Sequence, residues 1–255
     1  MCECDLSELN SSIEYSEPYD VFYHMAWEYT LKAQRDNPVL QEKNIKYTLD
    51  AVNLAQKLGC KKFIGAGSQA EYGKVDTVIS PETAAEPLTA YGMAKYSAGI
   101  LSRKLCQQYE IIHIWARIFS VYGCYDKEGT MLNYAIDCFV NGNTAKFSSA
   151  TQMWDYLHEK DAGKFLYLIG EYSTHSRIYC VANGESRPLR EFIMELRDLC
   201  NPDAKCEFAE KTDSESEEIS LQVNIEALIQ DTGYRPQIQF QEGIADVVYY
   251  SMKKQ

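Results

Sequence analysis

The chain has 255 residues, of which 45% are hydrophobic and 24% charged, and this composition indicates a globular protein with one large domain or a domain and a smaller lobe. Its formal net charge of −12 argues against a nucleic acid or an anionic membrane surface as a partner. No apolar run is long enough to span a bilayer and no signal peptide is recognisable, so we expect a cytoplasmic protein. Nine cysteines without a C-x-x-C pair predict reduced thiols and no metal site.

Short apolar runs alternate with helical patterns in the first half of the chain. Strands are predicted over 19–27, 60–68 and 110–123, and helices over 37–59 and 88–104. This alternation implies right-handed crossovers and a parallel sheet with helices on both faces. Beyond residue 123 the pattern is looser, and we expect short elements near 130–141 (helix), 178–182 (strand), 189–200 (helix) and 206–209 (strand), then a solvated acidic loop over 210–220.

Tyr91 and Lys95 lie four residues apart in a predicted helix, so their side chains share one face. Ser68 closes the preceding strand, at the carboxyl end where open parallel sheets bind ligands. A hydroxyl, a phenol and an ammonium at one crevice suit proton transfer to or from a carbinol or carbonyl oxygen, because the ammonium favours the phenolate. The spacing alone is weak evidence, because a tyrosine and a lysine four apart on a helix are usually a tyrosine packed at a rim beside a solvated lysine.

The strings "GAGSQAEYG" and "AYGMAK" resemble the extended short-chain dehydrogenase/reductase family, the NAD-dependent epimerase/dehydratase group that acts on nucleotide sugars. The resemblance continues in "VFYHMAW", "RIFSVYG", "WDYLHEKDAGKFLYLI" and "DTGYRPQIQFQEGI", in the family's order. It implies an α/β fold with an incomplete Rossmann-type parallel sheet, helices on both faces and a smaller C-terminal α/β substrate lobe. Residues 1–123 would form the dinucleotide-binding part and 124–255 mainly the substrate lobe, with 154–170 returning to the first part.

The resemblance also implies roles for individual residues. Tyr91 would be the general acid/base, Lys95 would bind the nicotinamide ribose and tune Tyr91, and Ser68 would orient the substrate oxygen. Four further residues would lie along the cofactor, NAD or NADP: Asp5, Leu6, His24 and Ala26. From the residues alone, His24 reads equally well as a satisfied core histidine, and Asp5 as a helix N-cap.

The residues after Ser68 narrow the expected reaction. The family's 4,6-dehydratases carry an Asp-Glu pair there and its 3,5-epimerising synthases a cysteine, whereas this chain has Gln69 and Ala70. Glu71 comes one position late and should point to the other side. What remains is hydride transfer at the sugar C4, by a 4-ketoreductase or by a 4-epimerase.

A nucleotide-diphosphate sugar is the expected substrate, and four residues are predicted to contact it: Gln69, Arg117, Trp154 and Arg187. Trp154 stands where many members have an arginine that grips the diphosphate. It could stack on a base or sugar, or simply pack in the interior. Arg117 or Arg187 would then supply the phosphate contact.

One family element has no counterpart in the sequence. The family opens with a strand and a Gly-x-x-Gly-x-x-Gly turn that holds the pyrophosphate, whereas the glycine cluster here, residues 65–68, belongs to a later strand. We therefore expect weak NAD affinity from this chain and an uncovered sheet edge. The alternative function is a catalytically impaired binding or oligomerisation module. By analogy with relatives we expect a homodimer formed through the helices that flank Tyr91.

Overall fold

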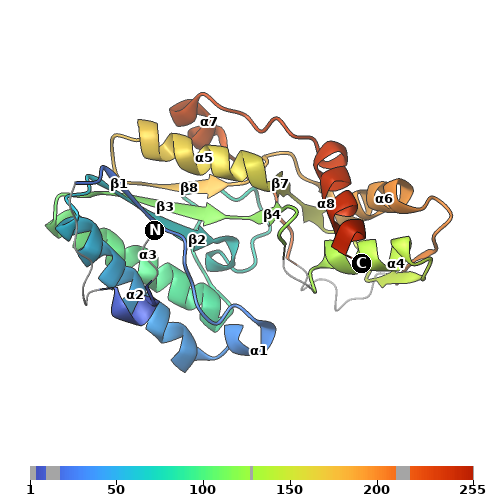
Figure 1. The fold of residues 1–255 in the computed structure, drawn as a ribbon, viewed down its shortest axis with the longest axis horizontal. Coiled ribbons are helices and arrows are strands. Elements are labelled where there is room, and N and C mark those ends of the chain that lie inside the picture. The colour runs from blue at the N-terminus through green and yellow to red at the C-terminus, as the bar shows by residue number, and fades with distance from the viewer. Residues whose placement is uncertain (1–3, 10–17, 127–128, 211–218, 255) are drawn as a thin grey trace.

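A parallel four-stranded sheet in the order β1-β2-β3-β8 is the centre of the larger part of the molecule (Figure 1). The structure, a computed structural model, describes residues 4–9, 18–126, 129–210 and 219–254. The sheet strands are Val21–His24 (β1), Lys62–Ser68 (β2), Ile112–Ile118 (β3) and Arg177–Val181 (β8). The expected parallel α/β architecture is therefore confirmed. Most of the acidic run expected as a loop, residues 211–218, lies outside the described residues.

Strand β8 belongs to the main sheet. Its residues fall in the part of the chain assigned mainly to the substrate lobe, but β8 pairs with β3 from Ile114↔Arg177 to Ile118↔Val181. The side chains of Tyr179, Cys180 and Val181 are almost completely buried, and they belong to the same core as β2 and β3. The apolar content of this short strand is what attaches it to the main sheet.

Helices cover both faces of the sheet (Figure 1). One face carries α2 (Pro38–Lys57) and α3 (Ala90–Gln108), and the opposite face carries α5 (Glu159–Tyr172), against which α7 (Glu226–Thr232) packs. Asn37 caps α2 by accepting hydrogen bonds from two backbone N–H groups, and Pro38 is its first residue. Thr89 caps α3 by accepting a hydrogen bond from the Gly92 N–H, 3.1 Å away. The Thr89 cap fixes the start of α3 and thereby the positions of Tyr91 and Lys95 in its first two turns.

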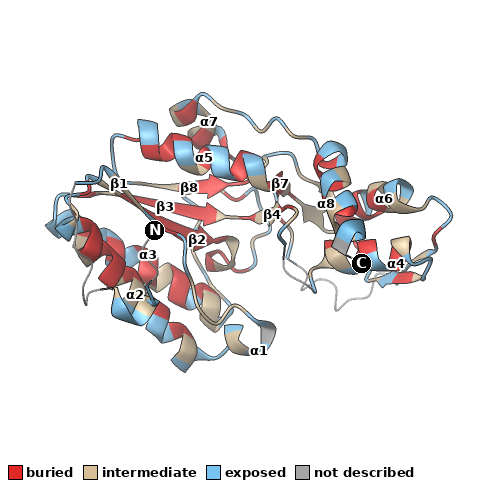
Figure 2. Ribbon diagram, in the orientation of Figure 1, coloured by how far each residue is buried: buried red, intermediate tan, exposed pale blue. Residues whose placement is uncertain are grey.

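A smaller lobe contains three helices around its own apolar core: α4 (Met131–Val140), α6 (Leu189–Cys200) and α8 (Phe240–Lys254). Three two-stranded ladders complete it or join it to the sheet: β4 (Ser120–Tyr122) with β7 (Tyr156–His158), β5 (Ala145–Phe147) with β10 (Cys206–Phe208), and β6 (Met153–Trp154) with β9 (Arg187–Pro188). Figure 2 shows the buried residues on the inward faces of both lobes. The α5 side chains Phe165 and Ile169 pack in the core of the main sheet.

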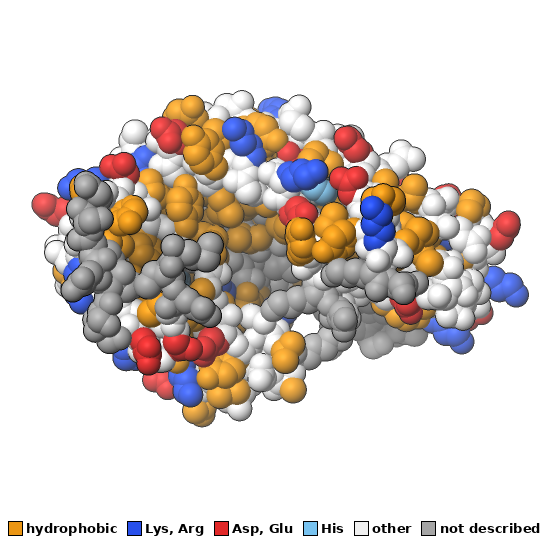
Figure 3. Space-filling model, in the orientation of Figure 1, with side chains coloured by type: hydrophobic (Ala, Val, Ile, Leu, Met, Phe, Trp, Pro, Cys, Tyr) orange, Lys and Arg blue, Asp and Glu red, His pale blue; other side chains and the backbone are white. Residues whose placement is uncertain are grey.

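Strand β1 forms one edge of the sheet and, within the described part of the chain, pairs with β2 alone. Tyr23 and Met25 at this edge are about two-fifths exposed, at 41% and 40%. Figure 3 shows hydrophobic side chains gathered in the hollow between the α5 side of the molecule and the α2 side.

Trp115 explains the glycine cluster of β2. A Cβ on Gly65 would lie 2.2 Å from the Trp115 ring, and one on Gly67 would lie 2.5 Å from its Nε1. The indole is 2% exposed and occupies the space that side chains at these positions would need. The cluster therefore serves close packing within the sheet rather than a ligand.

Substitution of Gly65 by alanine should destabilise the fold, because the added methyl group overlaps a buried ring. We expect Gly65→Ala to lower the free energy of unfolding by about 1–3 kcal/mol in urea denaturation. Gly163 is the matched control, since it is exposed within α5 and has no atom near its would-be Cβ. Gly163→Ala should raise stability by roughly 0.5–1 kcal/mol. Equal effects at the two sites would contradict this account of the cluster.

Candidate functional site

Ser68, Tyr91 and Lys95 converge at the carboxyl end of β2. Ser68 is the last residue of that strand and is buried, while Tyr91 and Lys95 occupy the first two turns of α3. The Ser68 side chain is near enough to the Tyr91 phenol to lower its pKa. Gly92 permits this approach, because a Cβ there would lie 2.3 Å from the Ala70 carbonyl oxygen. The structure thus brings together the three groups that the sequence singles out.

Burial dominates the ionisation of Tyr91. It raises the pKa of the phenol, while the Ser68 hydrogen bond and the charge of Arg35 lower it less strongly. Lys95, expected to be the tuning cation, keeps its Nζ 5.8 Å from the centre of the Tyr91 ring. The phenol is therefore protonated near neutral pH and can act as a proton donor.

Lys95 is held in the interior. It is 3% exposed, and its Nζ donates a hydrogen bond to the Ala66 carbonyl oxygen at 2.6 Å. The same Nζ lies 3.7 Å from the centre of the Trp27 ring. Burial, opposed by the charge of Glu71, lowers the pKa of Lys95 to about 7. Its charge therefore changes within the physiological range.

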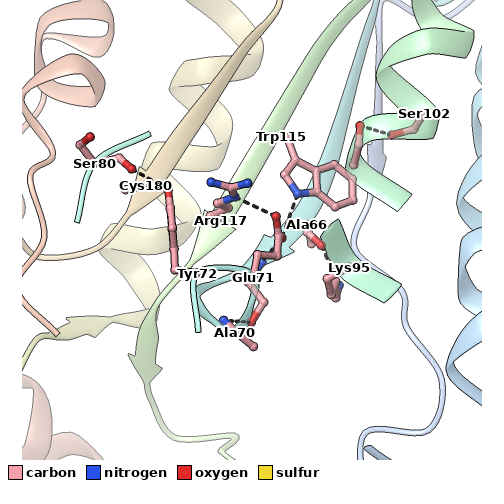
Figure 4. A network of polar contacts seen from close by, with 12 residues as sticks. Ala66, Ala70, Glu71, Tyr72, Ser80, Lys95, Ser102, Trp115, Arg117 and Cys180 are labelled. Carbon is pink, nitrogen blue, oxygen red and sulfur yellow. Dashed lines mark hydrogen bonds and ion pairs between the residues drawn. The ribbon is translucent and has the colours of Figure 1, made fainter. Parts of the chain in front are cut away.

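Glu71 anchors the turn that follows Ser68 (Figure 4). This turn is a short 3₁₀ helix, η2 (Gln69–Glu71), closed by a capping box in which the Glu71 carboxylate accepts a hydrogen bond from the Ser68 N–H at 2.8 Å. The fully buried carboxylate also accepts hydrogen bonds from Trp115 Nε1 at 2.9 Å and Arg117 Nε at 2.7 Å. Three donors thus occupy the Glu71 carboxylate.

Arg117 is placed as the ion-pair partner of Glu71. Its side chain is 4% exposed, and its guanidinium stacks on Tyr72 at 4.3 Å from the ring centre. The structure thus shows a structural partner for the arginine that was expected to reach a substrate phosphate. Because the Arg117 side chain is almost fully buried, it has little surface with which to contact a phosphate.

Arg187 and Trp154, both expected at the substrate, are direct cross-strand partners in the β6–β9 ladder. Arg187 borders a cavity of about 500 Å³ and makes two hydrogen bonds to Glu195, at 2.5 and 2.6 Å. Trp154 packs between the two lobes, with its ring 6.3 Å from that of Tyr156. The cavity has no lining residue in common with the Ser68, Tyr91 and Lys95 cluster.

The four residues expected along the cofactor occupy different environments. His24 Nε2 lies 3.2 Å from Thr48 Oγ1, and burial lowers the pKa of this histidine to about 4, so it is a neutral, satisfied core residue. Asp5 is exposed and caps a 3₁₀ turn, η1 (Leu6–Glu8), through a hydrogen bond from the Ser7 N–H. Leu6 is half-buried, and Ala26 is exposed just after β1. The geometry thus fits a core histidine at His24 and a helix N-cap at Asp5.

Two residues of the cluster were missed in the sequence: Trp27 and Arg35. The Trp27 ring meets the Tyr91 ring edge-on at 6.0 Å, and the Arg35 guanidinium lies 4.2 Å from the centre of the same ring. They follow β1, more than fifty positions before Tyr91, so no short-range spacing connects them to it. The one feature of the sequence that could have indicated them is their place after the carboxyl end of a predicted parallel strand, where ligands bind.

Metal ligands, membrane-spanning helices and disulfides are considered for the described ranges alone. Nowhere in them do three or more His, Cys, Asp or Glu side chains form a group that could hold a metal ion. The helices found there are too short or too polar to cross a membrane. The eight described cysteines carry free thiols.

The parallel sheet with helices on both faces defines a Rossmann-like protein, and Ser68, Tyr91 and Lys95 lie together at its carboxyl edge. Residues 1–182 match the NAD dependent epimerase/dehydratase family, and the chain belongs to that family. The dTDP-4-dehydro-6-deoxyglucose reductase of Escherichia coli is 26% identical over 199 residues, which cover 74% of this chain and 61% of the reductase. A probable UDP-glucuronate 4-epimerase of Rhizobium meliloti is 25% identical over 141 residues, 54% of this chain and 41% of the epimerase.

A solved structure supports the fold. RMD from Pseudomonas aeruginosa complexed with NADPH superposes with a TM-score of 0.87 at 17% identity, and the match covers 98% of this chain and 86% of that one. The chain thus reproduces the family fold over almost its whole length, while its alignments span less than two thirds of both curated relatives.

Proposed function

We propose that this chain provides the catalytic centre of a nucleotide-sugar 4-ketoreductase or 4-epimerase. The observation that carries the proposal is the meeting of Ser68, Tyr91 and Lys95 at the carboxyl edge of the sheet, where the serine lowers the pKa of the phenol. The two curated relatives are named for a reductase and a 4-epimerase of nucleotide-linked sugars, and both reactions need a proton exchanged at one sugar oxygen.

Proton transfer is the part of the reaction assigned to Tyr91. In reduction, the protonated phenol gives its proton to the C4 oxygen, while the Ser68 hydroxyl donates a hydrogen bond to the same oxygen. In epimerisation, Tyr91 must first lose its own proton, since burial favours the protonated phenol. The phenolate then takes the proton of the C4 hydroxyl and returns it after the 4-keto sugar has turned its other face towards the hydride donor. Ser68 is buried and Tyr91 is partly buried, which limits the water that would compete for this proton.

A nicotinamide cofactor, NAD or NADP, supplies or accepts the hydride when it is bound. The buried Lys95 and the partly buried Tyr91 fit its ribose end, because both carry hydrogen-bonding groups at the carboxyl edge of the sheet. The described residues offer no glycine turn for the pyrophosphate, since the glycines of β2 are occupied by Trp115. We therefore assign only the nicotinamide-ribose end of the cofactor to this part of the chain. Four residues are proposed only to border that end: His24, Ala26, Asp5 and Leu6.

A nucleotide-diphosphate sugar is the proposed substrate. The Gln69 Oε1 atom is buried and accepts no hydrogen bond from the described residues, so it is available to a sugar hydroxyl close to Ser68. Arg187 and Trp154 are proposed at the nucleotide end, where an arginine and an indole suit phosphate and base. A 4,6-dehydratase is disfavoured because Glu71 is saturated by internal donors.

A binding or oligomerisation module is the second candidate function. It is favoured by the Trp27 ring, which lies over the Lys95 ammonium where a ribose would bind. Such a module would use α3, whose Met93, Ile100 and Leu101 are about half exposed. We propose a homodimer through α2 and α3 for either function.

The two candidates differ in one assay. The protein is incubated with millimolar NADPH and a 4-keto-6-deoxy dTDP-sugar, and the loss of NADPH absorbance is followed. Oxidation of NADPH identifies a reductase. In a parallel incubation with UDP-linked sugars, interconversion of the C4 epimers without NADPH oxidation identifies an epimerase. If neither reaction occurs at saturating cofactor although the protein is a dimer in solution, the result would support the binding module and refute the catalytic proposal.

A further inference from the structure

Arg35 covers the ring of Tyr91. It belongs to the short helix α1 (Lys32–Arg35), and its guanidinium carbon lies 4.2 Å from the ring centre. The residue itself is exposed, so the arginine closes the solvent side of the tyrosine. No motif of the sequence assigns it a role, and it is the cation nearest to the ring centre, since Lys95 Nζ lies at 5.8 Å.

The segment that carries Arg35 is attached to the start of α3. The carboxylate of Asp36, the next residue, accepts a hydrogen bond from the Ala90 N–H at 2.9 Å. Ala90 immediately precedes Tyr91. Trp27, at the other end of the segment, meets the Tyr91 ring and donates a hydrogen bond from Nε1 to Gln41 in α2 at 3.0 Å. The contact between Arg35 and Tyr91 is therefore fixed by neighbours on both sides.

The charges of the two cations near Tyr91 behave differently with pH. Burial lowers the pKa of Lys95 to about 7, so this lysine loses charge as the pH rises above neutrality. An arginine keeps its charge throughout this range. The groups that face Tyr91 are, by element, Ser68 of β2, Glu71 of η2, Lys95 of α3, the uncharged Trp27 after β1, and Arg35 of α1.

We propose that Arg35 is a positioning residue for Tyr91, whose guanidinium, docked over the ring by α1, orients the phenol and stabilises its anionic form during proton transfer. A cation at the face of an aromatic ring is attracted by the ring quadrupole and more strongly by a phenolate. The step itself, which rests on the proposed function, moves one proton between the Tyr91 oxygen and the substrate oxygen and needs no other reactant. Arg35 takes no proton.

The inference is tested on the free protein with tyrosine labelled at the ring carbon that bears oxygen. The Tyr91 resonance is assigned by its loss in Tyr91→Phe, and its shift is followed against pH by NMR. Arg35→Gln removes the cation, so the pKa of Tyr91 should rise, by about one unit given that Arg35 is solvent-exposed. Arg35→Lys should restore more than half of that change. Lys43→Gln, which removes another ring-stacked cation beside Tyr29, should leave Tyr91 unaffected.

Lys95 provides a readout that separates charge from packing. Arg35 also lowers the pKa of Lys95 by repulsion, so loss of its charge should raise the pKa values of Tyr91 and Lys95 together. If Arg35→Gln merely admitted water, relief of burial would lower the pKa of Tyr91 and raise that of Lys95. Opposite shifts, or a Tyr91 value unchanged in Arg35→Gln, would overturn the inference. These measurements need no substrate, so a protein inactive on every nucleotide sugar would refute the proposed function and leave this result standing.

Discussion

Tyr91→Phe should abolish turnover of the sugar substrate while the fold persists. The substitution removes the proton donor and keeps the ring between Trp27 and Arg35. Loss of a positioned general acid costs about 10²- to 10⁴-fold in rate, and we expect kcat to fall by that factor with little change in KM. Steady-state kinetics on the wild type and the variant measure both constants.

The control for this prediction is Tyr96→Phe, in the next turn of the same helix. Tyr96 borders a small cavity of about 50 Å³ that none of Ser68, Tyr91 and Lys95 lines. Its variant should keep wild-type kcat. The free energy of unfolding of Tyr91→Phe should drop by only about 1 kcal/mol, the value of one hydrogen bond. A Tyr91→Phe protein with undiminished kcat would show that another group transfers the proton.

Glu71→Gln should produce the largest loss of stability among single substitutions at the site. The change leaves the Arg117 charge buried without its counter-ion, at 4% side-chain exposure. Breaking one side of a buried pair typically costs about 3–5 kcal/mol, which chemical denaturation can measure. Activity should also fall, because the Glu71 carboxylate holds the turn that positions Ser68.

An exposed ion pair supplies the comparison for Glu71. Lys160 and Asp246 lie 3.6 Å apart with both side chains more than three-fifths exposed. Asp246→Asn should change the free energy of unfolding by less than about 1 kcal/mol. If Glu71→Gln is no more destabilising than Asp246→Asn, the buried network does not hold the turn after Ser68.

The elements with strong local signals were predictable from sequence. The helix that became α2 carries an Asn-Pro start and a terminal glycine, and the strand that became β2 is a continuous apolar run, so both match to within a few residues. Tyr91 and Lys95 were found because four-residue spacing is readable on any helix. Helix α5 was not predicted as such, since its Gly163 and Gly170 weaken the helical pattern and only burial of Phe165 and Ile169 compensates.

The rest of the site depends on contacts between distant parts of the chain. Arg117 is separated from Glu71 by 46 positions, so its pairing in the interior could not be read from either motif. The same holds for Trp27 and Arg35, which reach Tyr91 only because α1 docks on the start of α3. Burial also reverses the expected direction of the Tyr91 pKa, a quantity that depends on the surrounding fold and not on the spacing to Lys95.

The most direct test of the account follows the hydride and the proton together. NADPH carrying deuterium at its transferable position is incubated with the protein and a 4-keto-6-deoxy dTDP-sugar, and the sugar is examined by NMR and mass spectrometry. The account predicts deuterium on C4 with the wild type, and a loss of at least about 10²-fold in the rate of labelling with Tyr91→Phe. Deuterium at any other carbon, or labelling that is equally fast without the phenol, would contradict it.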